Sequence, residues 1–470
     1  MIGLSLIIFF SVFAAAAPLI TPYDPIRSTN LAGSRAAPHW MTLLPSYRGS
    51  SRNIAPITDP SLSAMSSFNQ WQLSIPSSTA EIAYASDIGR PEDGKTGSVL
   101  IHIRKPSETR FTETVQEASV PFTSSYEAPQ RFTLDLYWNL ELSGNATTRI
   151  SAIIQDPEGA RFEIWMKDLE ATKGSWLKPT PRIDSWSPQL RLKLTQDILG
   201  SPEQKIFSTP GEYALILRVL VWSNDPGAVD VRLYVDDVEF RCYGAVFGFL
   251  GTDQFGADLF SQLVYGARIS LAVGVLASLL SVAIGTVLGI ASGYLGGAVD
   301  QVLMRFNDML LVLPSLPLLL VLIAVLGPTV WNVVILIGLL RFMSVARVIR
   351  SQVLSYKERP FIEAAKAAGA GAGNIMFKQL FPNVMSLTFA QLALSVPAAI
   401  ASEASLSWLG LGDPALPTWG RMLYMAHYYG VLKEWWWIIF PGLCIALVSI
   451  AFIFVGHAMD EILNPRLRPR

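Results

Sequence analysis

The sequence predicts an α-helical membrane protein with six transmembrane helices and an all-β sandwich domain outside the membrane. Of its 470 residues 51% are hydrophobic and only 16% are charged, whereas soluble globular proteins usually carry about 25% charged residues. Long uncharged stretches gather in the second half of the chain, and alternating apolar residues gather in the first half. The net charge of −1 gives no basic footprint of the kind that nucleic-acid binding requires.

The expected helices follow from the lengths of the uncharged stretches. The chain opens with an apolar run over residues 1–23. Four more stretches without charge cover residues 269–299, 309–340, 379–402 and 435–459. A spanning helix needs about 20 apolar residues, so 309–340 is too long for one straight helix, and Gly327-Pro328 inside it is a turn signal. We therefore expect helices near 306–326 and 329–348, which brings the number of spans to six.

The first apolar run has a second interpretation, as a cleaved signal peptide. Its four consecutive alanines, residues 14–17, resemble a small-residue cleavage site. However, the run has no basic residue at its start, and Pro18 follows the alanines directly. We favour a first transmembrane helix over residues 1–23, with cleavage left open.

The distribution of basic residues predicts the orientation. The loop between the fourth and fifth spans carries Arg347, Arg350, Lys357, Arg359, Lys366 and Lys378. Cytoplasmic loops carry an excess of Lys and Arg, so we expect this loop and both termini in the cytoplasm and residues 24–265 outside the plasma or inner membrane. Arg341, near the inner end of the fourth span, would snorkel toward the same side.

Aromatic residues support the same orientation. Trp435, Trp436 and Trp437 open the sixth span. Tryptophans are enriched at membrane–water interfaces, so these three are expected in the outer aromatic belt.

The external segment divides into a linker over 24–64 and a β-sandwich over 65–245. The linker is expected because its first part is rich in Ser, Pro, Thr and Asn. Strict alternation of apolar residues over 131–142 and 228–235, and a β-branched and aromatic run over 213–222, predict half-buried strands. Several short strands between turn residues indicate a sandwich.

Two further segments, GKTGSVLIHI at 94–103 and LYVDDVEF at 233–240, resemble strands of jelly-roll, galactose-binding-like modules. The resemblance implies glycan binding, in which aromatic rings stack on sugars. The tryptophans that could do this are Trp71, Trp165, Trp176 and Trp186. The alternative is that they fill the core of the sandwich, and we favour it for most of them because aromatic side chains dominate cores.

We expect no catalytic, cofactor-binding or metal-binding residues. The histidines His39, His102, His427 and His457 are scattered and form no ligand pair. Cys242 and Cys444 form no CxxC motif, which excludes a disulfide framework and a cysteine-based zinc site.

Residues 359–383 carry the strongest functional signal, with the sequence RPFIEAAKAAGAGAGNIMFKQLFPN. Pro360 suits the first turn of a helix, and the alanines after Glu363 favour helix and leave a slim surface. Gly369, with the glycines that follow it, allows a sharp turn into a second short helix. Met376 and Phe377 are suited to fill an apolar pocket on a partner, and Pro382 is expected to end this second helix. The alternative is a merely solvated, alanine-rich loop.

This segment resembles the EAA loop of ABC importer permeases. Further motifs of the same kind occupy residues 17–25 (APLITPYDP), 250–258 (LGTDQFGAD), 265–271 (YGARISL), 403–412 (EASLSWLGLG) and 464–468 (NPRLR). In this order, they look like the C-type permease subunit of oligopeptide/dipeptide ABC importers. The resemblance covers residues 1–26 and about 246–470, so 246–470 is expected to form a five-helix ABC type I importer permease core with its coupling loop near 355–383. The chain departs from the family pattern in two places. More than 200 residues are inserted after Asp24, and position 381 is Phe where the family usually has Leu.

The resemblance implies partners and roles for residues. The partners would be a second, homologous permease subunit, two cytoplasmic ATPases that bind ATP and Mg, and an external solute-binding protein. The residues expected to contact the ATPase are Glu363, Ala364, Ala365, Gly369, Met376 and Phe377. Glu363 could instead pair locally with Lys366. Glu403 is expected either to line the pathway or anchor the subunit interface, or to be a carboxylate in water at the membrane surface.

Peptides are the substrate that the resemblance implies, with oligosaccharides as the alternative because of the glycan-binding-like sandwich. A membrane-anchored external binding or sensing module is a third interpretation. The EAA-like segment argues against it, because a sensor has no need of a loop that docks an ATPase.

Overall fold

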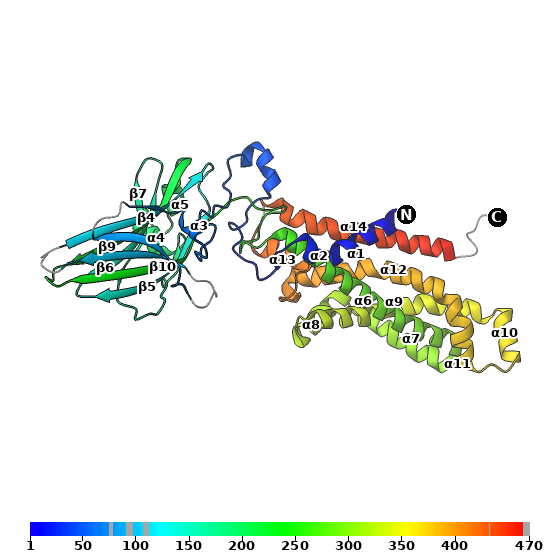
Figure 1. The fold of residues 1–470 in the computed structure, drawn as a ribbon. Coiled ribbons are helices and arrows are strands. Elements are labelled where there is room, and N and C mark those ends of the chain that lie inside the picture. The colour runs from blue at the N-terminus through cyan, green and yellow to red at the C-terminus, as the bar shows by residue number, and fades with distance from the viewer. Residues whose placement is uncertain (75–78, 91–96, 107–111, 432, 464–470) are drawn as a thin grey trace. The chain divides into compact units, whose positions relative to one another are not determined.

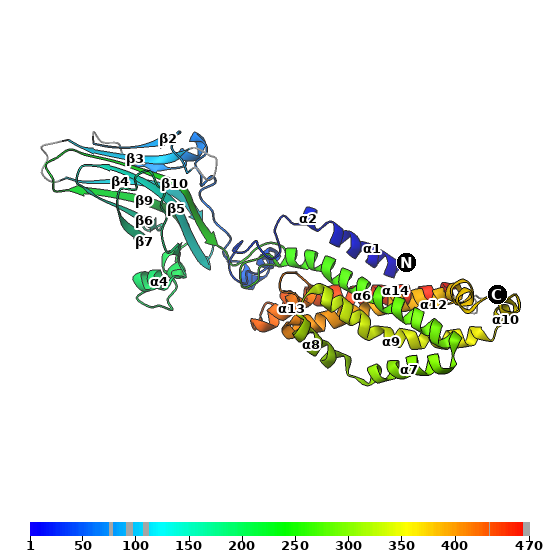
Figure 2. The ribbon, with the colours of Figure 1, turned by 90° about the horizontal axis from the view of Figure 1, so that it is seen from below.

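The computed structural model describes residues 1–74, 79–90, 97–106, 112–431 and 433–463 (Figures 1 and 2). The chain folds into two compact units. Met1–Thr29 and Ala257–Arg470 form a helical unit, and Asn30–Gly256 forms a β-rich unit that is inserted into it.

Helices make up the described part of the first unit. They are α1 (Ile2–Ala15), α2 (Ala17–Ile20), α6 (Leu259–Leu295), α7 (Gly297–Val312), α8 (Ser315–Leu326), α9 (Val330–Lys357), α10 (Pro360–Ala367), α11 (Ala372–Asn374), α12 (Phe381–Leu406), α13 (Trp419–Tyr428) and α14 (Trp435–Leu463). Among the described residues, four helical segments are long and apolar enough to cross a membrane: Leu259–Leu295, Val330–Lys357, Ala372–Leu411 and Trp435–Met459. Four of the predicted spans therefore correspond to long apolar helices.

The third predicted span, near 306–326, is wrong as a straight helix. It is divided between α7 and α8, which are bent by 87° relative to each other. The cause is Pro314, which precedes α8 with a φ of −65° and holds Leu313 in an extended conformation (ψ 130°), because a proline disfavours the helical region for the residue before it. The bent pair can count as one broken span.

The first predicted span is shorter than expected. Helix α1 has 14 residues, which at 1.5 Å per residue is about 21 Å and falls short of the roughly 30 Å hydrocarbon core. Arg268 of α6 donates to the carbonyl oxygens of Ala14 (2.6 Å) and Ala15 (3.0 Å) at the end of α1, so α1 is held against the helical unit. The count of six spans stays a prediction.

Helices α6 and α9 pack in very close contact through three glycines of α6. A Cβ on Gly285 would lie 2.6 Å from the Cβ of Val345, and one on Gly289 would lie 2.8 Å from the Cβ of Ile349. Gly293 approaches Val353 in the same way, at 2.8 Å. Small residues at four-residue spacing allow helix backbones to approach in membranes, so this stripe fixes α6 against α9.

The start of α14 corrects the predicted aromatic belt. Trp436 and Trp437 are only 2% and 1% exposed, while Trp435 is 45% exposed. Of the three tryptophans, Trp435 alone therefore has its ring available to a membrane interface, and the other two belong to the core of the helical unit.

The second unit is a sandwich of two antiparallel five-stranded sheets. The first sheet has the strand order β1 (Gln72–Leu73), β4 (Thr112–Ser124), β9 (Gly211–Ser223), β6 (Thr147–Gln155) and β7 (Arg161–Leu169). The second has the order β2 (Ala80–Ala85), β3 (Ser98–Lys105), β10 (Val229–Tyr243), β5 (Arg131–Ser143) and β8 (Ile183–Asp184). The three predicted strands are confirmed as β5, β9 and β10. On β5 the predicted alternation places Phe132, Leu134, Leu136, Trp138 and Leu140 in the core, each at most 1% exposed.

Residues 30–64, expected as part of a linker, are instead folded against the end of β10 and the residues that follow it. The backbone N–H of Ile54 donates to the carbonyl of Cys242 (3.0 Å), and the N–H of Cys242 donates back (2.8 Å). Burial alone would raise the pKa of Asp59, but hydrogen bonds from Ser63, Ser67 and Ser61 lower it to about 2. Serine and aspartate side chains build such turns from polar sequence, which explains why a linker-like composition is ordered here.

The two ends of the inserted unit lie side by side. The N–H of Asn30 donates to the carbonyl of Phe255, and that of Leu31 donates to the carbonyl of Gly256, both at 2.9 Å. The chain therefore enters and leaves the sandwich unit at one place.

Candidate functional site

Residues 360–380 form a helical hairpin at one end of the helical unit, and α8 and α13 lie at the other end (Figures 1 and 2). Helix α10 begins as predicted, with Arg359 in an extended conformation (φ −83°, ψ 146°) and Pro360 in the first turn. Glu363 also lies in this first turn, where a negative charge is favourable near the positive end of the helix dipole.

The turn of the hairpin depends on Gly369, which has a φ of +81°. The N–H of Gly369 donates to the carbonyl of Lys366 (2.9 Å), and that of Ala370 donates to the carbonyl of Ala365 (3.0 Å). A glycine in this left-handed region is the usual way to end a helix. No atom lies within 4 Å of a Cβ placed on Gly369, so glycine is required there for its backbone conformation and not for space.

A buried cluster anchors the hairpin to the spanning helices. Ile362, Ile375 and Leu380 of the hairpin are fully buried together with Val353 of α9 and Val384 of α12. Because interiors are close-packed and barely compressible, a displacement of the hairpin is expected to carry α9 and α12 with it.

The six residues predicted to contact a partner divide into two groups. Glu363, Ala364 and Gly369 are exposed, and Phe377 is 68% exposed. Two others, Ala365 and Met376, are half-buried and pack against the anchoring cluster.

The structure also shows contacts around the hairpin that were not expected. Lys366 does not pair with Glu363, and its Nζ instead lies 5.9 Å from the centre of the Tyr294 ring. Phe361, which was not predicted as a contact, is 37% exposed. No signal in the sequence separates it from its neighbour Ile362, which is fully buried.

The predicted helix end at Pro382 is wrong. Residues Ile375–Leu380 form a π-helical segment that continues directly into α12, in which Pro382 occupies the first turn. A proline ring would clash with the carbonyl four residues earlier in a regular helix. The wider π turn before Pro382 accommodates the ring, so the hairpin joins the spanning helix without a break.

Glu403 of α12 lies inside the helical unit and is only 4% exposed. The hydroxyl of Ser407 donates to its Oε1 at 2.7 Å. This burial contradicts the interpretation of a carboxylate in water at the membrane surface, whereas a role in the pathway or in a subunit interface stays a prediction.

Other motifs of the helical unit have structural roles. The carboxylate of Asp258 caps α6 by accepting the backbone N–H of Ser261 (2.9 Å). Residues 464–468 lie outside the described residues. Within the described residues, no group of three or more His, Cys, Asp or Glu side chains is placed to hold a metal ion.

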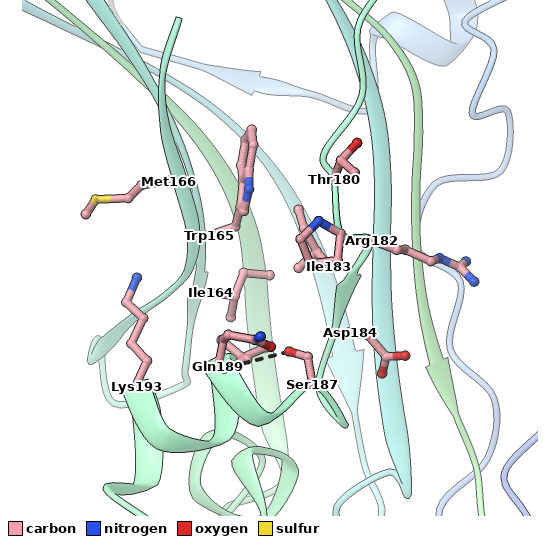
Figure 3. A pocket seen from close by; sticks show the side chains of 12 residues that line it. Ile164, Trp165, Met166, Thr180, Arg182, Ile183, Asp184, Ser187, Gln189 and Lys193 are labelled. Atoms are coloured by element: carbon pink, nitrogen blue, oxygen red, sulfur yellow. Dashed lines mark hydrogen bonds between the residues drawn. The ribbon is translucent and has the colours of Figure 1, made fainter. Parts of the chain in front are cut away.

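The sandwich unit contains a pocket of about 280 Å³ between the edge strands of its two sheets. Strand β7 forms one wall, the segment leading into β8 forms the opposite wall, and helix α4 (Pro188–Thr195) closes one end (Figure 3). Ile164 and Trp165 face Thr180 and Ile183 across the opening, and Gln189 lies at the helical end (Figure 3).

The charged groups around this pocket are neutralised in pairs. Arg182 donates to Asp135 (2.9 Å) and Lys193 donates to Glu163 (2.8 Å). Burial lowers the pKa of Arg182, but the hydrogen bond to Asp135 outweighs it and raises that pKa. Because its rim charges are paired, the pocket suits an uncharged polar ligand.

The four tryptophans that could stack on sugars lie in different surroundings. Trp71 is 5% exposed and belongs to the core. The Arg131 guanidinium covers the ring of Trp186 at 4.8 Å, and Trp176 is half-buried. Trp165 lines the pocket and packs against Trp138, with ring centres 5.6 Å apart. Of the four, Trp165 is the one that borders this pocket.

The chain is similar to known transport proteins. A model of the family described as "Binding-protein-dependent transport system inner membrane component" matches residues 285–469. The dipeptide transport system permease protein DppC of Alkalihalophilus pseudofirmus is 38% identical over 219 residues, which are 46% of this chain and 72% of the relative. The oligopeptide transport system permease protein OppC of Bacillus subtilis is 37% identical over 223 residues, again 46% and 72% of the two chains.

Among solved structures, TmCBM61 in complex with β-1,4-galactotriose covers 40% of this chain and 97% of its own, with 12% identity and a TM-score of 0.23. Glycan binding by the sandwich unit stays a prediction.

Proposed function

Because this chain belongs to the family of binding-protein-dependent transport system inner membrane components, we propose that it is the permease subunit of an ATP-driven ABC importer of peptides. The relatives that support this are dipeptide and oligopeptide permeases at 37–38% identity. The observation that carries the proposal is the 360–380 hairpin, which presents exposed apolar residues and is rigidly anchored to two spanning helices.

The hairpin is suited to transmit movement from an ATPase. Phe361 and Phe377 expose apolar rings, and the alanines between them leave the helix surface slim enough to enter a cleft on a partner. When two ATPase subunits close on ATP, a hairpin held in that cleft moves with them. Its anchor of Ile362, Ile375 and Leu380 then passes the movement to α9 and α12, and the pathway opens to the other side.

A cysteine-crosslinking experiment tests this docking. In the importer purified with its ATPase subunits, Phe377→Cys is expected to crosslink to an ATPase subunit through a short bis-maleimide. The control is Tyr428→Cys, whose side chain is 65% exposed. It belongs to α13, and this helix lies at the opposite end of the helical unit (Figure 1). A crosslink at both positions, or at neither, would refute docking through the hairpin.

The orientation and partners follow from the same assignment. The basic residues at 347–378 favour a cytoplasmic hairpin, and this places both termini in the cytoplasm and residues 24–265 outside. The chain would form half of the translocation pathway, with a second permease as the other half, and an external solute-binding protein would deliver the substrate. ATP and Mg would bind to the ATPase subunits, so this chain is a transport subunit and not itself the ATPase.

Oligosaccharide import is the second candidate, and the pocket beside Trp165 favours it. A neutral pocket with an aromatic wall suits a sugar ring. Titration of the full-length chain with neutral trisaccharides is expected to show about two- to tenfold weaker binding for Trp165→Ala, because an aromatic contact contributes about 0.5–1.5 kcal/mol. Trp186→Ala, whose ring is already covered by Arg131, is the control. If both variants bind as the unaltered chain does, the pocket is not a sugar site.

A further inference from the structure

The helical unit contains a cavity of about 350 Å³ beside the break between α7 and α8. Its walls come from the end of α7, the start of α8, the middle of α9 and Ser402 of α12. Most of the lining side chains are aliphatic. The charged one is Arg341, and it is accompanied by the hydroxyls of Ser315, Ser344 and Ser402.

Arg341 lies in the middle of a long apolar helix and not near its end, where the sequence had placed it. It is eleven residues after Val330, the first residue of α9, or about 16 Å along the helix at 1.5 Å per residue. Helix α9 continues to Lys357. An ionisable group at such a depth is costly and marks a functional site by default.

The guanidinium of Arg341 differs from those of the other arginines on α9. Arg347 donates to Asp308 (2.5 Å), and Arg350 donates to Asp300 through two bonds of 2.6 Å. Both aspartates belong to α7. Within the part of the chain that the structure describes, Arg341 has neither a hydrogen bond nor an ion pair through its side chain. It is the arginine of this helix that is free to bind something else.

The start of α8 adds a second group of donors to the same cavity. Pro314 precedes the helix and provides no side-chain cap, and its first turn contains no acidic residue. The first N–H groups of a helix have no partner within it and form the positive end of its dipole. In transporters with broken helices, such half-helix starts face anionic groups of the substrate. Ser315, the first residue of α8, lines the cavity.

The polar groups that line the cavity are therefore mostly hydrogen-bond donors. The cavity offers the five N–H donors of Arg341 and the backbone N–H and hydroxyl of Ser315 at the start of α8, and it contains no carboxylate among the described residues. Ser344 and Ser402 use their hydroxyl protons within their own helices, donating to Arg341 O (3.0 Å) and Ala398 O (2.7 Å). Such a site favours a compact anion that accepts several hydrogen bonds at once.

We propose that the cavity beside Arg341 binds a carboxylate of the transported peptide, its C-terminal group first of all. This inference rests on the proposed function of peptide import. A carboxylate matches the planar fork of a guanidinium, and the cavity volume is in the range of small-molecule sites.

Uptake of a matched pair of peptides tests the site. The probes are trialanine and trialanine amide, and the sample is the complete importer in proteoliposomes with ATP. The unaltered importer is expected to take up the free acid in preference to the amide. Arg341→Gln should reduce the ratio of acid to amide uptake about tenfold, which corresponds to the loss of a charge-assisted hydrogen-bond pair, while Arg341→Lys should retain part of it.

Arg347→Gln is the control, because it removes a charge from the same helix but outside the cavity, and it should leave the ratio unchanged. An equal loss of both uptakes in Arg341→Gln, or a loss of the second permease from the purified complex, would overturn the proposal. The second result would mean that Arg341 pairs with a carboxylate of that subunit.

A second measurement separates failure of the site from failure of peptide import. If the unaltered importer takes up neither peptide, the proposed function fails. Labelling of Arg341 by phenylglyoxal in the same complex, followed by mass spectrometry, should still be slowed by acetate and not by acetamide. Equal labelling with both compounds would overturn the carboxylate site itself.

Discussion

Replacing Gly369 by valine is expected to lower ATP-driven uptake by the assembled importer at least tenfold. The φ of +81° at this position is a region in which a β-branched residue is an outlier, and strain of this kind costs about 1–3 kcal/mol. The turn would relieve the strain by changing its conformation, and α10 would then leave the position in which its exposed face fits the partner. Steric crowding does not contribute to this loss of uptake, because no atom lies within 4 Å of the added Cβ.

The control for this substitution lies two residues further on. Gly371 has a φ of −70° and a ψ of 161°, which valine adopts readily, and its Cβ position is also open. Uptake and copurification of the ATPase subunits should therefore be near normal in Gly371→Val and reduced in Gly369→Val. Equal activity of the two variants would show that the conformation of the turn is unimportant for coupling.

Replacing Gly289 by isoleucine is expected to prevent normal folding of the helical unit. The new Cβ would lie 2.7 Å from the carbonyl oxygen of Ala346 and 2.8 Å from the Cβ of Ile349. Neither atom can move without separating α6 from α9, and overpacking of this kind costs about 1–3 kcal/mol or more. We expect a large loss of monodisperse protein in detergent and a lower unfolding temperature for what remains.

Gly442→Ile on α14 provides the comparison, because no atom lies within 4 Å of its Cβ position. The same side chain is added to a spanning helix, but at a position without close neighbours. Stability similar to that of the unaltered chain is expected. If Gly289→Ile folds as well as Gly442→Ile, the close contact of α6 and α9 is not what holds the unit together.

The sequence was most informative where one physical pattern dominates. Strict alternation placed β5 correctly because every second side chain of that strand enters the core. Hydropathy located four long helices for a similar reason. It did not locate the break at Leu313, because hydropathy averaged over many residues does not change when one residue is extended. Pro314 was the signal for the break, since a proline disfavours the helical conformation of the residue before it.

For the candidate site, the residue types were easier to predict than their directions. Ala365 and Met376 are of the expected residue types but are half-buried against the anchoring cluster. Ala365 lies three residues after the buried Ile362 and therefore on the same face of α10. The glycines at 285, 289 and 293 recur every fourth residue, so their close packing could have been predicted from the sequence. The free side chain of Arg341 could not, since its isolation depends on where Asp300 and Asp308 lie.

The closeness of the two ends of the sandwich unit has an evolutionary consequence. Asn30 and Leu31 are hydrogen-bonded to Phe255 and Gly256, so the first and last residues of the inserted unit are adjacent. A single recombination event at these two adjacent ends could add or remove the whole inserted unit, Asn30–Gly256, and leave the helical unit intact. Versions of this permease with a different module, or with none, should therefore be viable, and Thr29 and Ala257 are the natural positions at which to graft them.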